Sequence, residues 1–405
     1  MRGVSPGSIW RDAEFIRFWT GHSVSQFGAA MTQVALPLVA LLTLGASAAD
    51  VGLLRTAEFL PYLLLTLPAG ALVDRVRRRP LMIVADSVLG AIVLLLLFVH
   101  DRNDAWLIYA VALAYGALGT VFFPARAALL KIMLPEELLA DANGALTATR
   151  EGLRIIAPLA GAGLYTLLGG GAVAVLDSAT FAASALFLSR MRVAEAKPAP
   201  PERHFVREVT AGLRHVWETL PLRQIVGGVA VALLVVGFAE TLIFYVIAAL
   251  GKSPSFFGVF ATIQGVGSIA GGVTAAAILR RAGDVRLVGL GLALFAFADL
   301  CLIVPSLGVV LVAGPIAGIG VAWAIVGFST ALQMRTPLVI QGRVSAAADL
   351  TLSVAQATSI ATGALLSTLV DFRILFVVMA AVVLASSGYL LSRREPTPAA
   401  ATMEA

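Results

Sequence analysis

The stretch 70–99 reads GALVDRVRRRPLMIVADSVLGAIVLLLLFV, and it contains the two features that decide the fold. An apolar run at about 49–73 ends in a cluster of arginines at 75–79, and a second apolar run fills 80–99. About 20 apolar residues are enough for a helix to cross the hydrocarbon core of a bilayer. The stretch therefore predicts two membrane-spanning helices joined by a short basic loop.

The composition of all 405 residues extends this prediction to the rest of the chain. Hydrophobic residues make up 59% of the sequence and charged residues 13%, whereas soluble domains have about 45–50% and about 25%. Twelve helices of about 20 residues would need about 240 apolar residues, which this composition supplies. These values exclude a disordered chain, a disulfide scaffold and an ordinary soluble enzyme. The single Cys301 cannot form an intrachain disulfide.

We therefore expect an all-α membrane protein with twelve transmembrane helices arranged as two six-helix bundles. The predicted spans are about 17–43, 49–73, 80–99, 105–130, 143–168, 171–190, 222–250, 255–279, 286–304, 307–333, 344–369 and 372–391. Their boundaries divide the chain into an N-terminal bundle (1–190), a linker (191–221), a C-terminal bundle (222–391) and a tail (392–405). Within the linker, residues 206–220 could form a short amphipathic helix.

Lysine and arginine between the spans predict the orientation. The odd-numbered links carry only Arg102, Lys252 and Arg373, whereas the even-numbered links and both ends carry most of the other bases. Because cytoplasmic loops are enriched in Lys and Arg, we expect both termini in the cytoplasm of a multi-pass protein of the cell membrane. The net charge of +5 is therefore read as membrane topology and not as a nucleic-acid footprint. The first apolar run is too long for a signal peptide.

The loop after the second span also carries a recognisable spacing. Gly70 is followed four residues later by Asp74, then by Arg75 and by the pair Arg78 and Arg79. This loop resembles the signature of the major facilitator superfamily, except that residue 77 is Arg where that family usually has Gly. The second half repeats only the spacing between the glycine and the arginine pair. Gly272 lies eight residues before two arginines, but Ala276 stands in the Asp position. We therefore expect a charge lock in the first half alone.

Further stretches resemble the bacterial efflux branch of that superfamily, which holds macrolide exporters, siderophore exporters and transmembrane secretion effectors. They are 124–128, 134–138, 176–181, 333–337 and 341–344. In span five, Pro158 and Gly161 with their small neighbours resemble the Gly-Pro motif of drug/proton antiporters. Small residues and proline allow close helix approach and a bend. The resemblance implies an exporter of amphiphilic small molecules that works by proton antiport with alternating access.

The resemblance also implies a gate. Asp74 would cap the start of span eleven, where free backbone N–H groups favour a carboxylate, and would lock the inner gate. Arg75 and Arg78 would complete the charge network. Arg126 at the end of span four could pair with Asp86 or with Asp74. Arg154, deep in span five, needs an acidic partner or an anionic substrate.

Ionisable residues inside the predicted spans are the candidates for proton coupling, because such residues usually face a cavity or a partner. Glu240 in span seven is the first choice, since it has no base nearby in sequence and the superfamily lines its cavity with that span. Glu58 could instead be neutralised by Arg55, which lies three residues away on the same helical face. Asp299 and His22 are the remaining candidates.

The substrate cavity is expected to be mostly apolar. Gln26 and Gln33 share one face of span one with His22. Phe244 lies one turn beyond Glu240, and span ten offers Trp323 and Gln333. Each of these side chains could equally well serve packing.

The sequence contains no Walker loop, paired-histidine motif or nucleophile elbow, so we expect neither an enzyme nor a metal or other cofactor. The expected partners are a small-molecule substrate, protons and the bilayer, but no nucleic acid, and the chain is expected to act as a monomer. An importer or specific metabolite carrier of the same fold, or a non-transporting membrane partner, are the alternatives.

Overall fold

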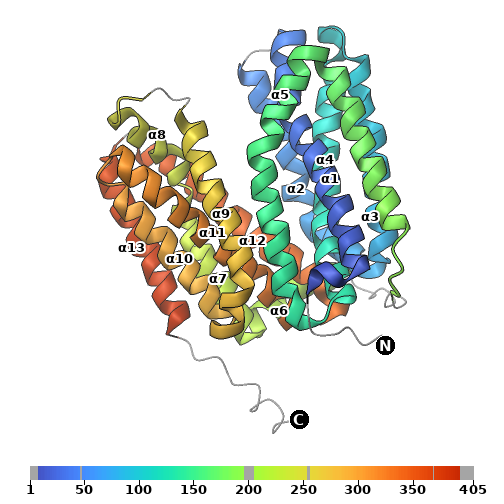
Figure 1. The fold of residues 1–405 in the computed structure, drawn as a ribbon. Helices are drawn as coiled ribbons and strands as arrows, with labels where there is room; N and C mark the ends of the chain where they lie inside the picture. The colour runs from blue at the N-terminus through green and yellow to red at the C-terminus, as the bar shows by residue number, and fades with distance from the viewer. Residues whose placement is uncertain (1–7, 46–47, 196–204, 253–255, 368, 393–405) are drawn as a thin grey trace. The chain divides into compact units, whose positions relative to one another are not determined.

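The computed structural model describes residues 8–45, 48–195, 205–252, 256–367 and 369–392, and every regular element in these ranges is a helix (Figure 1). The α-helices are α1 (Ala13–Leu38), α2 (Ala48–Arg75), α3 (Arg78–Val93), α4 (Ala105–Met133), α5 (Glu136–Ser189), α6 (Phe205–Glu218), α7 (Leu220–Val236), α8 (Ala239–Ala249), α9 (Phe257–Ala282), α10 (Asp284–Cys301), α11 (Leu307–Arg335), α12 (Gln341–Leu366) and α13 (Phe372–Leu391).

Helix α5 contains two of the predicted spans. Its 54 residues would extend about 81 Å as one straight helix, well beyond the about 30 Å of a bilayer core. A kink at Gly169 divides it, and the φ of +80° at this residue is open to glycine but strained for other residues. The predicted gap between spans five and six, at 169–170, therefore coincides with a sharp reversal made by one glycine.

Each of the other predicted spans also corresponds to a helix, with three local departures. Span one continues past Leu38 as a π-helical turn, Val39–Thr43, and span three ends in a 3₁₀ segment, Leu94–Phe98. Span seven is divided, because α7 stops at Val236 and α8 starts at Ala239. The amphipathic helix expected in the linker is present as α6.

Eight helices in the described ranges are long and apolar enough to cross a membrane, or nine if the bent pair Thr210–Glu218 and Leu220–Val236 counts as one span. The kinked α5 counts once among the eight. Together with the exclusively helical fold, this establishes a multi-pass membrane protein.

The chain forms two compact units. Unit 1 comprises residues 1–142, 152–215 and 336–350, and unit 2 comprises 143–151, 216–335 and 351–405. In unit 1, α4 packs against α2 and α3. The core there joins Leu36 of α1, Leu54 of α2, Val93 of α3, Val111 of α4 and Ala174 of α5.

In unit 2, α11 packs against α9 and α10, and α13 packs against α10 and α7. Glycines allow the closest of these contacts. A Cβ added to Gly291 of α10 would lie 2.5 Å from the carbonyl oxygen of Gly320 in α11, and one on Gly318 would lie 2.0 Å from that of Gln264 in α9. Membrane helices lack a hydrophobic driving force between them, so such close backbone approach is a main source of their packing energy.

Candidate functional site

The buried carboxylate of Asp74, at the C-terminal end of α2, caps the start of α12. Asp74 is 3% exposed, and its Oδ1 accepts a hydrogen bond from the backbone N–H of Gly342 at 2.8 Å. Its Oδ2 accepts from the N–H of Arg343 at 3.1 Å. The first N–H groups of a helix have no partner within the helix, and a carboxylate there satisfies them and complements the helix dipole. The contact implied by the resemblance is thus present.

Two guanidinium groups flank this carboxylate. Nε of Arg343 lies 3.2 Å from Oδ2 of Asp74, and Nη2 of Arg78 lies 3.9 Å from Oδ1. Arg78 also donates to the carbonyl of Leu338 at 3.4 Å. The role of Arg343 was missed from sequence, because its partner lies 269 residues away and only the folded chain brings the two together.

A close helix crossing lies directly beside the cap. A Cβ added to Gly70 would lie 2.6 Å from Cβ of Ala346 and 2.7 Å from the carbonyl oxygen of Gly342. One added to Gly342 would lie 2.6 Å from the carbonyl oxygen of Gly70. Two glycines facing each other therefore bring α2 and α12 near enough for the Asp74 carboxylate to reach the backbone of α12. Glycine 212 of α6 packs in the same way on the carbonyl of Arg343.

The first turn of α3 is held by a second carboxylate. Glu195, just after α5, accepts from the backbone N–H of Arg78 at 2.6 Å and of Arg79 at 2.9 Å. The Arg79 side chain donates in return to the carbonyls of Leu188 and Ser189 at the end of α5. The arginines of the loop thus differ in role, and Arg75 remains in the last turn of α2, half-buried.

Further along α1, His22 is enclosed by polar and aromatic groups. Its ring is stacked between Phe18 and Phe122, with ring centroids 5.7 and 5.6 Å away. Its Nε2 lies 3.2 Å from Nε2 of Gln26 and 3.2 Å from Nη1 of Arg126. A guanidinium can only donate, so Nε2 of His22 acts as an acceptor and the proton of the neutral ring sits on Nδ1.

Arg126 of α4 therefore lies beside His22 and also over the ring of Phe123, 5.3 Å from its centroid. It acts electrostatically on Asp349 of α12 as well. Asp86, one of its two expected partners, accepts from the hydroxyl of Ser184 at 2.6 Å.

The next polar pair joins α1 to α2. Nε2 of Gln33 donates to Oε1 of Glu58 at 3.2 Å. Gln33 is exposed and Glu58 is half-buried. The pairing of Glu58 with Arg55 stays a prediction, because the Arg55 side chain lies outside the described part of the structure.

In span five, Gly161 is pressed against α1, since a Cβ there would lie 2.9 Å from both Cα and the carbonyl oxygen of Met31. Pro158 is half-buried and lies one turn earlier within the helix. The side chain of Arg154 is exposed within unit 1. Small residues at this motif thus allow the close approach that was expected.

In unit 2 the three residues expected to line the substrate cavity contact different partners. Trp323 of α11 donates to the hydroxyl of Thr274 in α9 at 3.0 Å. The Gln333 side chain is buried and accepts from Nδ2 of Asn143 at 2.6 Å. Phe244 of α8 is 43% exposed and stacks on Phe257.

Two of the proton-coupling candidates also belong to unit 2. Asp299 of α10 is 4% exposed, and its Oδ2 has no hydrogen-bond partner among the residues that the structure describes. Glu240 lies near the start of α8, three residues after Gly237 in the break of span seven, but its side chain lies outside the described part of the structure.

Unit 2 carries an ion pair of its own at a position other than Ala276, and the expectation of a charge lock in the first half alone stays a prediction. Asp284, the first residue of α10, accepts from Nε of Arg335 at 2.9 Å and from Nη2 at 2.6 Å. Arg335 is the last residue of α11, so this two-point ion pair joins two helix ends within unit 2. Asp284 lies eight residues after Ala276, the position at which the second half lacks the acid of the motif. Its partner lies 51 residues away, so local spacing did not indicate the pair.

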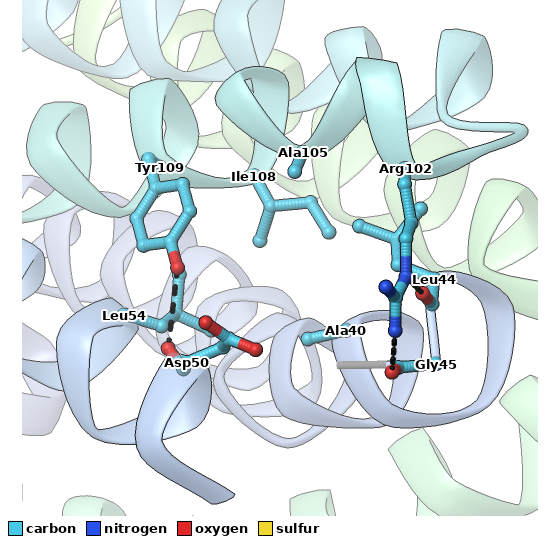
Figure 2. Close-up of a pocket in the computed structure, with 9 residues that line it drawn as sticks. All are labelled: Ala40, Leu44, Gly45, Asp50, Leu54, Arg102, Ala105, Ile108 and Tyr109. Atoms are coloured by element: carbon cyan, nitrogen blue, oxygen red, sulfur yellow. Dashed lines mark hydrogen bonds between the residues drawn. The ribbon is translucent and has the colours of Figure 1, made fainter. Parts of the chain in front are cut away.

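A pocket of about 510 Å³ lies near the start of α4 in unit 1, apart from the residues above (Figure 2). Arg102 crosses one wall and donates to the carbonyls of Leu44 and Gly45 at 3.0 and 2.7 Å. The Tyr109 hydroxyl donates to the carbonyl of Asp50 at 3.3 Å. Among the described residues, no group of three or more His, Cys, Asp or Glu is placed to hold a metal ion.

Comparison with known proteins agrees with this architecture. The model of the Major Facilitator Superfamily matches residues 18–250 and 225–404, so the chain belongs to this family. Macrolide efflux protein A of Streptococcus pyogenes is 27% identical over 205 residues, and the multidrug efflux pump Tap of Mycolicibacterium fortuitum is 32% identical over 214. Each alignment covers 49% of this chain, and 50% and 51% of the relative, so the match spans about half the length of these relatives.

Solved structures share the fold at low sequence identity. A bacterial homologue of the iron transporter ferroportin, in an outward-facing state with soaked iron, has a TM-score of 0.76 at 16% identity, over 94% of this chain and all of that one. The human organic anion transporter TETRAN has a TM-score of 0.78 at 16% identity, over 94% and 99%. These likenesses show the major facilitator fold of two six-helix bundles and nothing about a substrate.

Proposed function

We propose that the chain is a secondary active transporter that exports amphiphilic small molecules, of the macrolide or cationic drug kind, in exchange for protons. Its membership of the superfamily and the efflux relatives support transport outward. The observation that carries the proposal is the cap of Asp74 on α12. This carboxylate joins the end of one helix to the first N–H groups of another, and a gate requires such a contact, which can form and break.

In this proposal the two bundles rock about a central site, and the Asp74 cap stabilises one of the two end states of the transport cycle. When the cap is made, the N–H groups of Gly342 and Arg343 are satisfied. When it breaks, water must replace the carboxylate at α12, and Arg78 and Arg343 must find other partners. The same groups thus favour one state without trapping it. The bundle boundaries for this motion are the predicted ones, 1–190 and 222–391.

Proton coupling needs a carboxyl or imidazole that gains and loses a proton during the cycle. Glu240 remains our first candidate, followed by Glu58 and Asp299. Glu58 accepts a hydrogen bond from Gln33, a side chain that carries no charge. His22 is the weakest candidate, because Arg126 and Gln26 already occupy its acceptor nitrogen. We place the protein in the cell membrane as a monomer with both termini in the cytoplasm.

The proposal is tested by the accumulation of radiolabelled erythromycin and of ethidium in efflux-deficient bacteria. The strains carry the wild type, Glu240→Gln or an empty vector, each with and without a protonophore. We expect lower accumulation with the wild type, and we expect both the protonophore and Glu240→Gln to abolish the difference. Efflux that survives Glu240→Gln would keep the exporter and move the proton site to Glu58, Asp299 or His22. Accumulation equal to the empty vector, with the protein present in the membrane, would contradict export of these compounds.

A further inference from the structure

Asp177, in the second half of α5, is a fully buried carboxyl enclosed by hydroxyl groups. It is 0% exposed. Its Oδ2 accepts from the hydroxyls of Thr32 in α1 and Tyr115 in α4, and its Oδ1 accepts from Thr180 one turn further along α5 at 3.2 Å. Three different segments of unit 1 thus direct hydroxyls at one carboxyl group.

The backbone of α1 and the three hydroxyls surround Asp177, which is fully buried. A Cβ added to Gly28 of α1 would lie 2.4 Å from Oδ1 of Asp177, so the bare backbone of α1 covers the remaining side. In the described part of the chain, no Lys, Arg or His lies within ion-pair distance of Asp177. A buried carboxylate without a cation is costly unless several donors satisfy it.

Hydroxyl partners suit a group that changes its protonation state. A Thr or Tyr hydroxyl both donates and accepts, whereas a guanidinium or a backbone N–H only donates. When Asp177 is ionised, Thr32, Tyr115 and Thr180 donate to it. When it is protonated, its own O–H donates to one of these oxygens, and no backbone movement is needed. The Asp74 cap differs here, because its donors are backbone N–H groups and arginines that cannot accept a proton back.

Tyr115 connects this carboxyl to a second one. Its hydroxyl donates to Asp177, and Glu58 of α2 lies near enough to act on Tyr115 electrostatically. Helices α2 and α4 are in tight contact here, since a Cβ on Gly116 would lie 2.0 Å from the carbonyl oxygen of Glu58. Glu58 is half-buried, and its Oε1 accepts from the exposed side chain of Gln33. The groups facing Asp177 from α1 and α5, Thr32 and Thr180, do not titrate.

We infer that Asp177 is a proton-binding site of this transporter and that Tyr115 relays its proton to and from Glu58. This inference rests on the proposed proton antiport and names a residue for it that the sequence did not single out. In the relay, the carboxylic proton of Asp177 passes to the Tyr115 oxygen while the phenolic proton leaves for Glu58, directly or across one water. The step ends with an Asp177 carboxylate, a neutral Tyr115 and a Glu58 carboxylic acid, so charge and protons balance.

Infrared difference spectroscopy of the purified full-length protein, recorded between acidic and alkaline pH, tests the site without any substrate. We expect a carboxylic C=O band that Asp177→Asn abolishes. Asp86→Asn is the matched control, because Asp86 is also buried but has a single serine partner, and it should leave that band in place. An unchanged difference spectrum in Asp177→Asn would overturn the inference.

Two further measurements keep the test decisive. If Asp177→Asn does not fold, Tyr115→Phe and Thr32→Val each remove one donor and should shift the titration midpoint of the same band, and no shift in either would overturn the site. In proteoliposomes, Asp177→Asn should lose proton-driven accumulation of erythromycin yet keep erythromycin exchange without a gradient. If the wild type shows no proton-driven transport, the proposed antiport is wrong. The infrared result would still decide whether Asp177 binds a proton.

Discussion

Two close helix crossings, one in each unit, each bring two glycines face to face but differ in chemistry. In unit 1, Gly70 of α2 faces Gly342 of α12, and in unit 2, Gly272 of α9 faces Gly144 of α5. A Cβ on Gly342 would lie 2.6 Å from the carbonyl oxygen of Gly70, and one on Gly144 would lie 2.3 Å from that of Gly272. Four residues after the first glycine stands Asp74, whereas Ala276 follows the second.

The comparison of the two crossings shows which part of the contact is due to helix packing and which part is due to charge. Unit 2 makes an equally close crossing with alanine in the acidic position, so the carboxylate is not needed for the helices to approach. Beside the second crossing, Asn143 makes neutral hydrogen bonds to Thr330 and Gln333 of α11. We conclude that the glycines build both crossings and that Asp74 adds to one of them a contact whose strength depends on charge.

The substitution Asp74→Asn is expected to have the largest effect. It leaves Arg78 and Arg343 without their buried acid, which disfavours the state in which the cap is made, because removing one partner of a buried ion pair costs about 3–5 kcal/mol. We expect erythromycin efflux to fall at least about tenfold, with the amount of protein in the membrane little changed. Ala276→Ser, at the corresponding position of unit 2, is the control and should transport normally. Normal efflux by a well-expressed Asp74→Asn protein would show that the cap has no part in transport.

The glycines should behave alike in the two units, in contrast to the acid. Gly70→Ala places a methyl group 2.6 Å from Cβ of Ala346, and Gly272→Ala places one 2.8 Å from the carbonyl oxygen of Gly144. Overpacking of this kind costs about 1–3 kcal/mol. Both variants should therefore melt at lower temperature in detergent. Gly163→Ala, with nothing within 4 Å of the added methyl, should melt no lower than the wild type. A normal melting temperature for either crossing variant would contradict the packing argument.

The ion pair of unit 2 should matter for stability more than for transport. Arg335→Gln removes the two-point contact with Asp284, and the Arg335 side chain is 23% exposed, so we expect a loss of about 1–2 kcal/mol. Thermal melting in detergent measures the loss, and erythromycin efflux at equal protein level measures the function. The exposed Arg286, two residues along α10, gives the control Arg286→Gln. Loss of efflux as large as in Asp74→Asn would mean that both units carry a functional charge contact.

The smallest effect is expected at the carboxylate that caps α3. Glu195→Gln keeps one acceptor oxygen for the N–H groups of Arg78 and Arg79 but loses the negative charge at the helix start. Such a cap contributes about 0.5–1 kcal/mol, so a slight fall in melting temperature is expected. A fall in melting temperature greater than that of Gly70→Ala would contradict this ranking. It would show that the Glu195 cap on α3 stabilises the fold more than the crossing of α2 and α12 does.

The fold was readable from the sequence because it depends on long apolar runs and on glycine. The spans, the reversal at Gly169 and the linker helix all follow from local composition. What could not be predicted is contact between distant residues. Asp74 was expected to reach the start of α12 because the family motif implies it, but its second guanidinium, Arg343, was not.

The same limit applies inside the spans. Local spacing suggested Arg55 as a partner of Glu58, which stays a prediction, and the structure adds Gln33 from another helix, which no spacing indicated. Asp177 resembled a family stretch and nothing more, since its three hydroxyl partners lie on α1, α4 and the next turn of α5. Asp284 and Arg335 look like ordinary loop charges until α10 and α11 pack together. Side-chain partners across a bundle depend on helix rotation, which hydrophobic runs without a polar face do not specify.

The central claim, that the Asp74 carboxylate holds the first turn of α12, is tested most directly by hydrogen–deuterium exchange on peptides that cover residues 338–346. We expect the amides of Gly342 and Arg343 to exchange faster in Asp74→Asn than in the wild type, while the peptides around Gly144 in unit 2 are unchanged. Equal exchange at the start of α12 in the two proteins would contradict it.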